Sequence, residues 1–245
     1  MKPANPFGPG EELVFQVKVL GAKSGTARFS VGSPSQVEER LVWPITMQAQ
    51  SQGLTDRLYP IRDRFVSLWD PVTRLPVEGR LTADEGRKKR AMSIRFRRDS
   101  GEPARAEVVL EGAGGTETFA ETMDRSAQDL QSAVYWLRTR PLQAGERDEV
   151  PIVAGKRQWA MGAEVIGPSP IKTPAGKFEA VLVRVATSFA GKLQSQQPIA
   201  VYFSADARHL PLRIEADLLL GKLTAELVSF ELGTDVKPEE DHAGR

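Results

Sequence analysis

The chain has 245 residues, 40% hydrophobic and 27% charged, which is ordinary for a globular protein and enough to bury a core. Its 33 basic and 32 acidic residues nearly cancel, so we expect no global field that attracts nucleic acid and no nucleic-acid partner. Cysteine is absent, which excludes disulfides, thiol nucleophiles and thiolate metal sites.

The chain shows no sign of a membrane-spanning segment or a signal peptide. No stretch reaches the ~18 consecutive apolar residues that a membrane helix requires, so no transmembrane segment is predicted. The start, Met1-Lys2-Pro3, is not followed by the apolar segment of a signal peptide. The sequence therefore predicts either a cytoplasmic protein or a mature exported chain whose signal has been removed.

Residues 1–125 are predicted to form an N-terminal β half. Apolar and polar residues alternate over 12–19, which is the strand period, and a glycine-containing turn at 21–25 returns the chain as a hairpin. Similar alternation or turn signals predict further strands at 41–49, 64–69, 92–96, 106–110 and 116–119.

Residues 126–140 are predicted to form a central connecting helix. Ser126 is placed to cap its start, with Asp129 three residues later as the second member of a capping box. Pro141 ends the helical pattern. One apolar face is expected to contain the residues at helical spacing, which are Leu130, Ala133, Val134 and Leu137.

Residues 141–233 are predicted to form a C-terminal β half, and the polar residues 234–245 a disordered tail. The strongest alternation in this half covers 178–188, followed by strand patterns at 199–203, 212–218 and 223–232. The predicted fold is therefore mainly β, with two curved antiparallel sheets or half-barrels joined by one central α-helix.

The two halves share a weak repeat. The pattern P-x-x-x-G-E at residues 6–11 recurs at 141–146, an offset of 135, and Leu75-Pro76 recurs as Leu210-Pro211 at the same offset. Chance would explain a few short matches, but these matches occur in the same order and at the same spacing in both halves. We therefore favour an internal duplication.

Several segments together resemble the bacterial DUF3108 family of unknown function. They are PGEELVF, AKSGTARF, DLQSAVYWLRTRPLQAGE, TPAGKF and IAVYFSADARHLPLRI, in this order over about residues 6–232. The resemblance implies an exported, mostly β protein of the periplasm or cell envelope, with no established activity. The missing export signal is a departure that we attribute to truncation.

The polar side chains of the predicted helix are the first candidate site. Asp129, Ser132, Tyr135 and Arg138 would line a cleft between the two halves if they bind a ligand. The structural alternative is that Asp129 caps the helix, Ser132 allows close packing, and the other two bind nearby backbone or carboxylates. The structural role is the favoured interpretation.

A second candidate lies at Asp206, between Ser204 and His209. These residue types occur in hydrolytic triads, but triad members normally converge from separate elements and no nucleophile elbow surrounds the serine. A turn organised by Asp206 is the favoured interpretation. With only two histidines, His209 and His242, no metal site and no cofactor are predicted.

Trp43 and Trp69 are the third candidate, because aromatic residues in both halves are able either to line an apolar cleft or to fill it. Three functions stay open. The first is a non-enzymatic envelope protein that holds a lipid, an acyl chain or a partner protein between its halves. The others are a structural or protein-interaction module and, third, a hydrolase.

The basic run from Arg87 to Arg90 is the strongest local charge feature. It is placed to meet phosphates of lipid headgroups or nucleic acid, or simply to solubilise a hairpin tip. No interleaved aromatic residues support nucleic-acid binding, and the solvated hairpin is the favoured interpretation.

Overall fold

The computed structural model describes residues 5–189, 192–193, 198–218 and 221–234. The fold is mainly β, as predicted, with 64% of the described residues in strands and two helices. The residues beyond 234, where the sequence predicts a disordered tail, lie outside the described residues.

The first part of the chain forms one meander of strands and a short helix. Its elements are β1 (Glu12–Val19), β2 (Ala22–Val31), β3 (Ser35–Val37), β4 (Arg40–Ser51), α1 (Gly53–Leu58), β5 (Ile61–Asp70), β6 (Leu75–Glu85), β7 (Lys88–Arg97), β8 (Arg105–Gly112) and β9 (Gly115–Thr122).

A longer helix and a second meander follow. These elements are α2 (Leu130–Arg138), β10 (Arg147–Ala154), β11 (Arg157–Pro168), β12 (Ile171–Thr173), β13 (Gly176–Phe178), β14 (Ala180–Phe189), β15 (Lys192–Leu193), β16 (Ile199–Ser204), β17 (Pro211–Leu218) and β18 (Gly221–Glu231).

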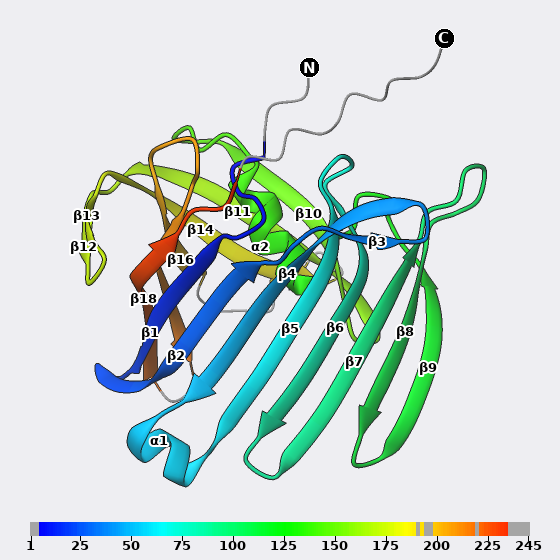
Figure 1. Cartoon of the computed structure of the whole chain (residues 1–245), viewed down its shortest axis with the longest axis horizontal. Helices are drawn as coiled ribbons and strands as arrows, with labels where there is room; N and C mark the ends of the chain where they lie inside the picture. The colour runs from blue at the N-terminus through cyan, green and yellow to red at the C-terminus, as the bar shows by residue number, and fades with distance from the viewer. Residues whose placement is uncertain (1–4, 190–191, 194–197, 219–220, 235–245) are drawn as a thin grey trace.

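Strands from both halves join in one continuous antiparallel sheet. Its order is β10-β11-β14-β16-β17-β18-β1-β2-β4-β5-β6-β7-β8-β9, while β12 and β13 form a separate hairpin (Figure 1). The prediction of two sheets is wrong because β18 pairs with β1 along its whole length, from Glu12↔Glu231 to Val19↔Leu223. The sheet is not closed, so the two half-barrels are not confirmed.

The helix α2 packs inside the curve of this sheet (Figure 1). It contacts β10 from one end of the sheet and β4, β5 and β6 from the other arm. Ala133 and Leu137 pack with β10, β11 and β14, whereas Tyr135 packs with Phe7, Trp43 and other residues of the first core cluster. One short helix therefore contributes to the cores of both arms.

The helix starts later than predicted, at Leu130, and Asp129 rather than Ser126 is its N-cap. The residues before it are extended, because Gln128 makes a parallel bridge to Ile152 of β10. Ser126 instead lies in a turn, where its backbone N–H donates to the Asp124 carboxylate at 2.7 Å. The capping box is real but shifted by three residues, with Ser132 as its second member.

The buried face of α2 also differs from the predicted apolar face. Leu130 is 44% exposed, whereas Gln131 is only 3% exposed. Ala133 and Leu137 are buried as predicted. The helical spacing alone misplaces this face because α2 is enclosed on more than one side, by β10 and by β4, β5 and β6.

The opening turns of the two meanders have the same backbone geometry. Gly10 and Gly145 both have φ of 89°, in the left-handed region that glycine adopts without steric cost. Each donates its N–H at 2.8 Å to the carbonyl of a returning strand, Val31 in one half and Val165 in the other. The first part of the predicted repeat is therefore present in the backbone.

The Leu-Pro sites match as well. Trp69 faces Pro76 directly after a β-bulge, and Phe203 faces Pro211 directly after another. The residue two positions before each proline is not glycine but has a positive φ, which is 62° at Arg74 and 43° at His209. The strand order within the two meanders is also the same. These shared features support the duplication.

Leu137→Ala should test the observed helix face. Leu137 is 4% exposed, so its truncation should leave a cavity and lower the free energy of unfolding by about 2–5 kcal/mol. Leu130→Ala is the matched control and should cost less than about 0.5 kcal/mol. Urea denaturation gives both values, and equal losses would mean that α2 is oriented differently.

Candidate functional site

A fully buried ion pair lies at the C-terminal end of α2. Arg138 donates from Nη1 and Nη2 to the two carboxylate oxygens of Glu11, at 2.6 and 2.8 Å. Both side chains are 1% exposed. Removing two charges from water is costly, and a bidentate pair offsets that cost only when its geometry is good, as it is here.

The Arg138 guanidinium is also held by aromatic rings. Its carbon lies 5.0 Å from the centre of the Phe7 ring and 5.1 Å from that of Tyr135, within cation–π range. Phe7 in turn contacts Tyr135 edge-on at 4.7 Å and Trp69 at 4.9 Å between ring centroids. Trp43 completes the cluster, 5.8 Å from Trp69.

The turn between β16 and β17 closes the other side of the ion pair. Arg138 donates to the carbonyl of Arg208 at 3.2 Å, and its own carbonyl lies 2.8 Å from Nδ1 of His209. The segment before β1, the end of α2 and this turn therefore meet at one residue. They are far apart in sequence, so Arg138 fixes three segments to one another.

A second buried polar group lies at the start of α2. The Asp129 carboxylate accepts hydrogen bonds from the Ser67 hydroxyl and the Ser132 N–H, both at 2.7 Å. A side chain at Gly79 would place its Cβ 2.9 Å from the carboxylate, so β6 approaches this closely only because residue 79 is glycine. Burial raises the pKa of Asp129, and these hydrogen bonds lower it by less.

Tyr135 and the two tryptophans have polar tips without partners. Tyr135 OH, Trp43 Nε1 and Trp69 Nε1 are buried and make no hydrogen bond within the described part of the chain. Burial and the nearby Glu11 charge raise the pKa of Tyr135, so its hydroxyl stays protonated. Three buried donors in one aromatic cluster are therefore without an acceptor among the described residues.

Asp206 organises a turn. Its carboxylate accepts from the Ser204 hydroxyl at 2.7 Å and from the Arg208 N–H at 3.0 Å. The Ser204 hydroxyl also accepts from the Leu210 N–H at 2.8 Å, and His209 is engaged with the Arg138 carbonyl. The turn that we favoured from the sequence is present, and these contacts form no serine–histidine relay.

The structure thus sorts the seven predicted residues into three places. Asp129 and Ser132 lie at the start of α2, and Tyr135, Arg138, Trp43 and Trp69 surround Phe7 near its end. The first six are at most 2% exposed and therefore line no open surface cleft, whereas Asp206 lies on the surface.

Sequence reasoning missed the partners of these residues. Glu11, Phe7, Ser67 and His209 each contact a predicted residue but lie in separate elements. Only Glu11 carried a signal, as the final residue of the repeated P-x-x-x-G-E pattern, and that pattern does not indicate a partner.

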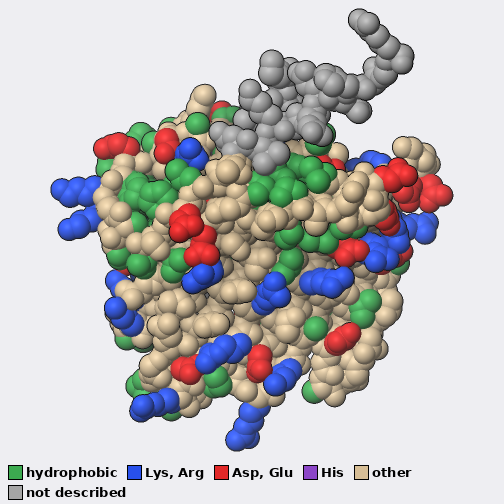
Figure 2. All heavy atoms as spheres, in the orientation of Figure 1, with side chains coloured by type: hydrophobic (Ala, Val, Ile, Leu, Met, Phe, Trp, Pro, Cys, Tyr) green, Lys and Arg blue, Asp and Glu red, His purple; other side chains and the backbone are tan. Residues whose placement is uncertain are grey.

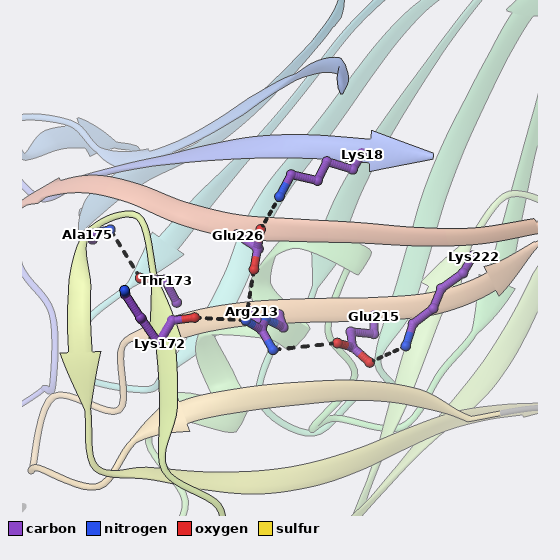
Figure 3. Close-up of polar contacts among 8 residues, drawn as sticks. All are labelled: Lys18, Lys172, Thr173, Ala175, Arg213, Glu215, Lys222 and Glu226. Carbon is purple, nitrogen blue, oxygen red and sulfur yellow. Dashed lines mark hydrogen bonds and ion pairs between the residues drawn. The ribbon is translucent and has the colours of Figure 1, made fainter. Parts of the chain in front are cut away.

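A chain of charges crosses the outer face of the sheet where the two halves join (Figure 3). Glu226 of β18 accepts from Lys18 of β1 at 2.6 Å and from Arg213 of β17 at 2.8 Å. On β17, Glu215 lies 2.7 Å from Lys222 of β18 and 3.8 Å from Arg213. These opposite charges neutralise one another and link β17, β18 and β1, the strands that form the seam between the two halves.

The β12–β13 hairpin covers one end of this network (Figure 3). Arg213 donates to the Lys172 carbonyl of β12 at 2.8 Å, and the Ala175 N–H donates to the Leu227 carbonyl at 3.1 Å. Phe178 of β13 contacts Phe230 of β18 with ring centroids 6.3 Å apart. The hairpin is therefore a fixed cover for the seam.

No group of three or more His, Asp or Glu side chains is placed to hold a metal ion within the described ranges. Neither helix in the described part of the chain has the length and apolar character needed to span a bilayer.

Comparison with known proteins adds a family and a fold. The model of the family described as "Protein of unknown function (DUF3108)" matches residues 14–228. No curated protein matches the chain. A β-barrel-like protein of the domain of unknown function DUF1849 from Brucella abortus is 9% identical, with a TM-score of 0.60 over 93% of this chain and 99% of that one. The likeness shows a shared fold.

Two further solved structures match with TM-scores of 0.33. One is a candidate lipoprotein from Parabacteroides distasonis, 10% identical, and the other is a candidate exported protein with a YmcC-like fold from Bacteroides fragilis, 8% identical. Each match covers 94% of this chain and 100% of the other.

Asp129→Asn should change how stability depends on pH. The pKa of Asp129 is raised above 3.8, so folding at higher pH must bury a charge. The stability of the native protein relative to Asp129→Asn should therefore be greatest at low pH and fall as pH rises above the usual pKa of an aspartate. Asparagine keeps the helix cap.

Asp124→Asn is the control with the opposite sign. Hydrogen bonds from Ser126 lower the pKa of Asp124, so the native advantage over this variant should grow as pH rises through the acid range. Thermal melts across the pH range measure both slopes. A native advantage over Asp129→Asn that grows with pH would contradict the buried-carboxylate assignment.

Proposed function

The chain belongs to the DUF3108 family, whose function is unknown, and from that premise we propose that it is a non-enzymatic cell-envelope protein that binds a protein partner. Family membership supports the envelope location, because the sequence resemblance implies exported proteins. We also propose two related β halves, residues 1–125 and 141–233, joined by the segment 126–140, which contains α2.

The observation that carries the proposal is the open edge of the sheet at β9. This strand pairs with β8 and with no other described strand. Only Phe119 and Glu121 of its eight residues are half-buried, and the rest are exposed (Figure 1). An edge strand presents a row of unpaired N–H and C=O groups, which a strand from another protein can pair with.

The opposite edge of the sheet is protected, which makes β9 distinctive. At β10, Gln128 donates its N–H to the Pro151 carbonyl and accepts from the Val153 N–H, both at 2.8 Å. Pro151 itself has no N–H to offer a partner. By contrast, β9 contains no proline and no lysine, the residues that commonly block edge pairing.

Site-specific photo-crosslinking in the bacterium that makes the protein tests this edge. Thr118 of β9, Val109 of β8 and Ser93 of β7 are register partners in one row across the sheet. A photoreactive residue at 118 should give a discrete adduct with one envelope protein. The same residue at the exposed position 93, two strands away, should give none.

Adducts of equal intensity at both positions would indicate general proximity and would contradict recognition at the edge. Absence of an adduct at 118, in cells where the protein is made and folded, would contradict the proposal as well.

A second candidate function is binding of an acyl chain or other lipid between α2 and the sheet. The observation that favours it is the unpartnered set of buried donors, Tyr135 OH, Trp43 Nε1 and Trp69 Nε1, which fits the oxygens of a lipid headgroup. Because these side chains are at most 2% exposed, entry requires movement of α2 or of the segment before β1.

Native mass spectrometry of the purified protein, followed by organic extraction, distinguishes this candidate. A lipid-binding protein should carry co-purified lipid that is reduced in Tyr135→Phe, which removes one donor but keeps the ring. If neither the native protein nor Tyr135→Phe carries lipid, this candidate is excluded, and water is then the acceptor for the three buried donors.

A further inference from the structure

The short helix α1 holds two leucines out into solvent. Leu54 and Leu58 are 69% and 75% exposed, and no residue of α1 is buried. They lie one helical turn apart and therefore on the same side of the helix. Exposing large apolar side chains is unfavourable, so an exposed pair on one side needs an explanation.

The orientation of α1 is fixed by a polar anchor. The Asp56 carboxylate accepts from the Ser51 hydroxyl at 2.7 Å and pairs with Arg62 at 2.6 Å. The Ser51 hydroxyl also accepts from the Ile61 N–H at 2.8 Å. Asp56 thus faces β4 and β5, and this anchor keeps the leucines turned away from the sheet.

The basic run between β6 and β7 lies beside α1. The ring of Tyr59, which is 46% exposed, packs so closely on Gly86 that a Cβ there would lie 2.8 Å from it. The Gly86 N–H also donates to the Pro60 carbonyl at 2.7 Å. These contacts bring the turn at residues 86–87 next to the C-terminal end of α1 (Figure 1).

Three cations at this place are left without an acidic partner. Lys89 pairs with Asp84 at 3.2 Å and Arg90 with Glu85 at 3.0 Å. The exposed side chains of Arg57, Arg87 and Lys88 make no ion pair with any described residue. Figure 2 shows Lys and Arg side chains protruding along this lower end of the molecule.

We propose that this end of the protein docks on the surface of an anionic phospholipid bilayer. The α1 patch consists of Leu54, Leu58 and Tyr59 with the cations Arg57, Arg87 and Lys88. Leucine side chains insert at the boundary of headgroups and acyl chains, tyrosine favours the interface, and the cations meet lipid phosphates.

The shape of the patch favours lipid over a protein partner. Its two leucines belong to a short helix at one end of the sheet (Figure 1) and are 69% and 75% exposed, so a protein partner would need a pocket that receives both side chains. A fluid bilayer accommodates a protruding apolar tip without one. The contact is peripheral and is separate from the β9 edge, which lies at the end of the sheet order while α1 connects β4 and β5.

Vesicle flotation tests the proposal. The full chain should float with vesicles of phosphatidylethanolamine and phosphatidylglycerol, and weakly or not at all with phosphatidylcholine vesicles. Leu54→Ser/Leu58→Ser should weaken binding by at least ~10-fold, because it removes the inserted apolar groups. Arg57→Gln/Arg87→Gln/Lys88→Gln should weaken it similarly and remove most of its dependence on salt.

Leu41→Ser and Arg105→Gln are the matched controls. Leu41 is 48% exposed and Arg105 is exposed, and both lie away from α1 at the starts of β4 and β8. Neither change should alter flotation. All substituted side chains are exposed, so circular dichroism and thermal melts should match the native protein.

Absence of binding to anionic vesicles, or equal binding by the leucine variant and the native chain, would overturn the proposal. A lipid-free complex with a purified envelope protein that requires Leu54 and Leu58 would assign the patch to a protein and would overturn it too. Neither result bears on crosslinking at β9, so the two proposals fail separately.

Discussion

The buried pair of Glu11 and Arg138 is the interaction on which the arrangement of the molecule depends. Its charges are removed from water, so each stabilises the fold only while the other is in place. Through it, the segment before β1, the end of α2 and the turn before β17 occupy one point. Phe7 reaches the aromatic cluster because the same segment is held there.

A single sheet with one protected and one open edge follows from the way the halves join. Pairing of β18 with β1 places the two seam strands in the middle and leaves β10 and β9 at the ends. Because α2 and aromatic side chains pack inside the curve of the sheet, we favour binding surfaces on the outside. The open strand β9 and the α1 patch are two such surfaces with different chemistry.

The sequence predicted the elements better than their contacts. Alternation located most strands, since the strand period is a local property, and the repeated Gly-Glu and Leu-Pro sites marked turns of matching geometry. The single sheet was missed because pairing of residue 12 with 231 leaves no local signal. Arg138 was expected to bind nearby backbone or a carboxylate, but its actual partner, Glu11, lies 127 positions away in the sequence and leaves no local signal.

The free energy of unfolding of Arg138→Met, with and without Glu11→Leu, tests the central claim most directly. Arg138→Met alone should cost about 3–5 kcal/mol, because it leaves the Glu11 charge buried, and the double variant should recover at least half of that loss. Arg147→Met, which removes an exposed pair with Glu164, should cost less than about 1 kcal/mol. The account would be contradicted if Arg138→Met lowered the free energy of unfolding no more than Arg147→Met does. It would also be contradicted if the double variant recovered none of the loss.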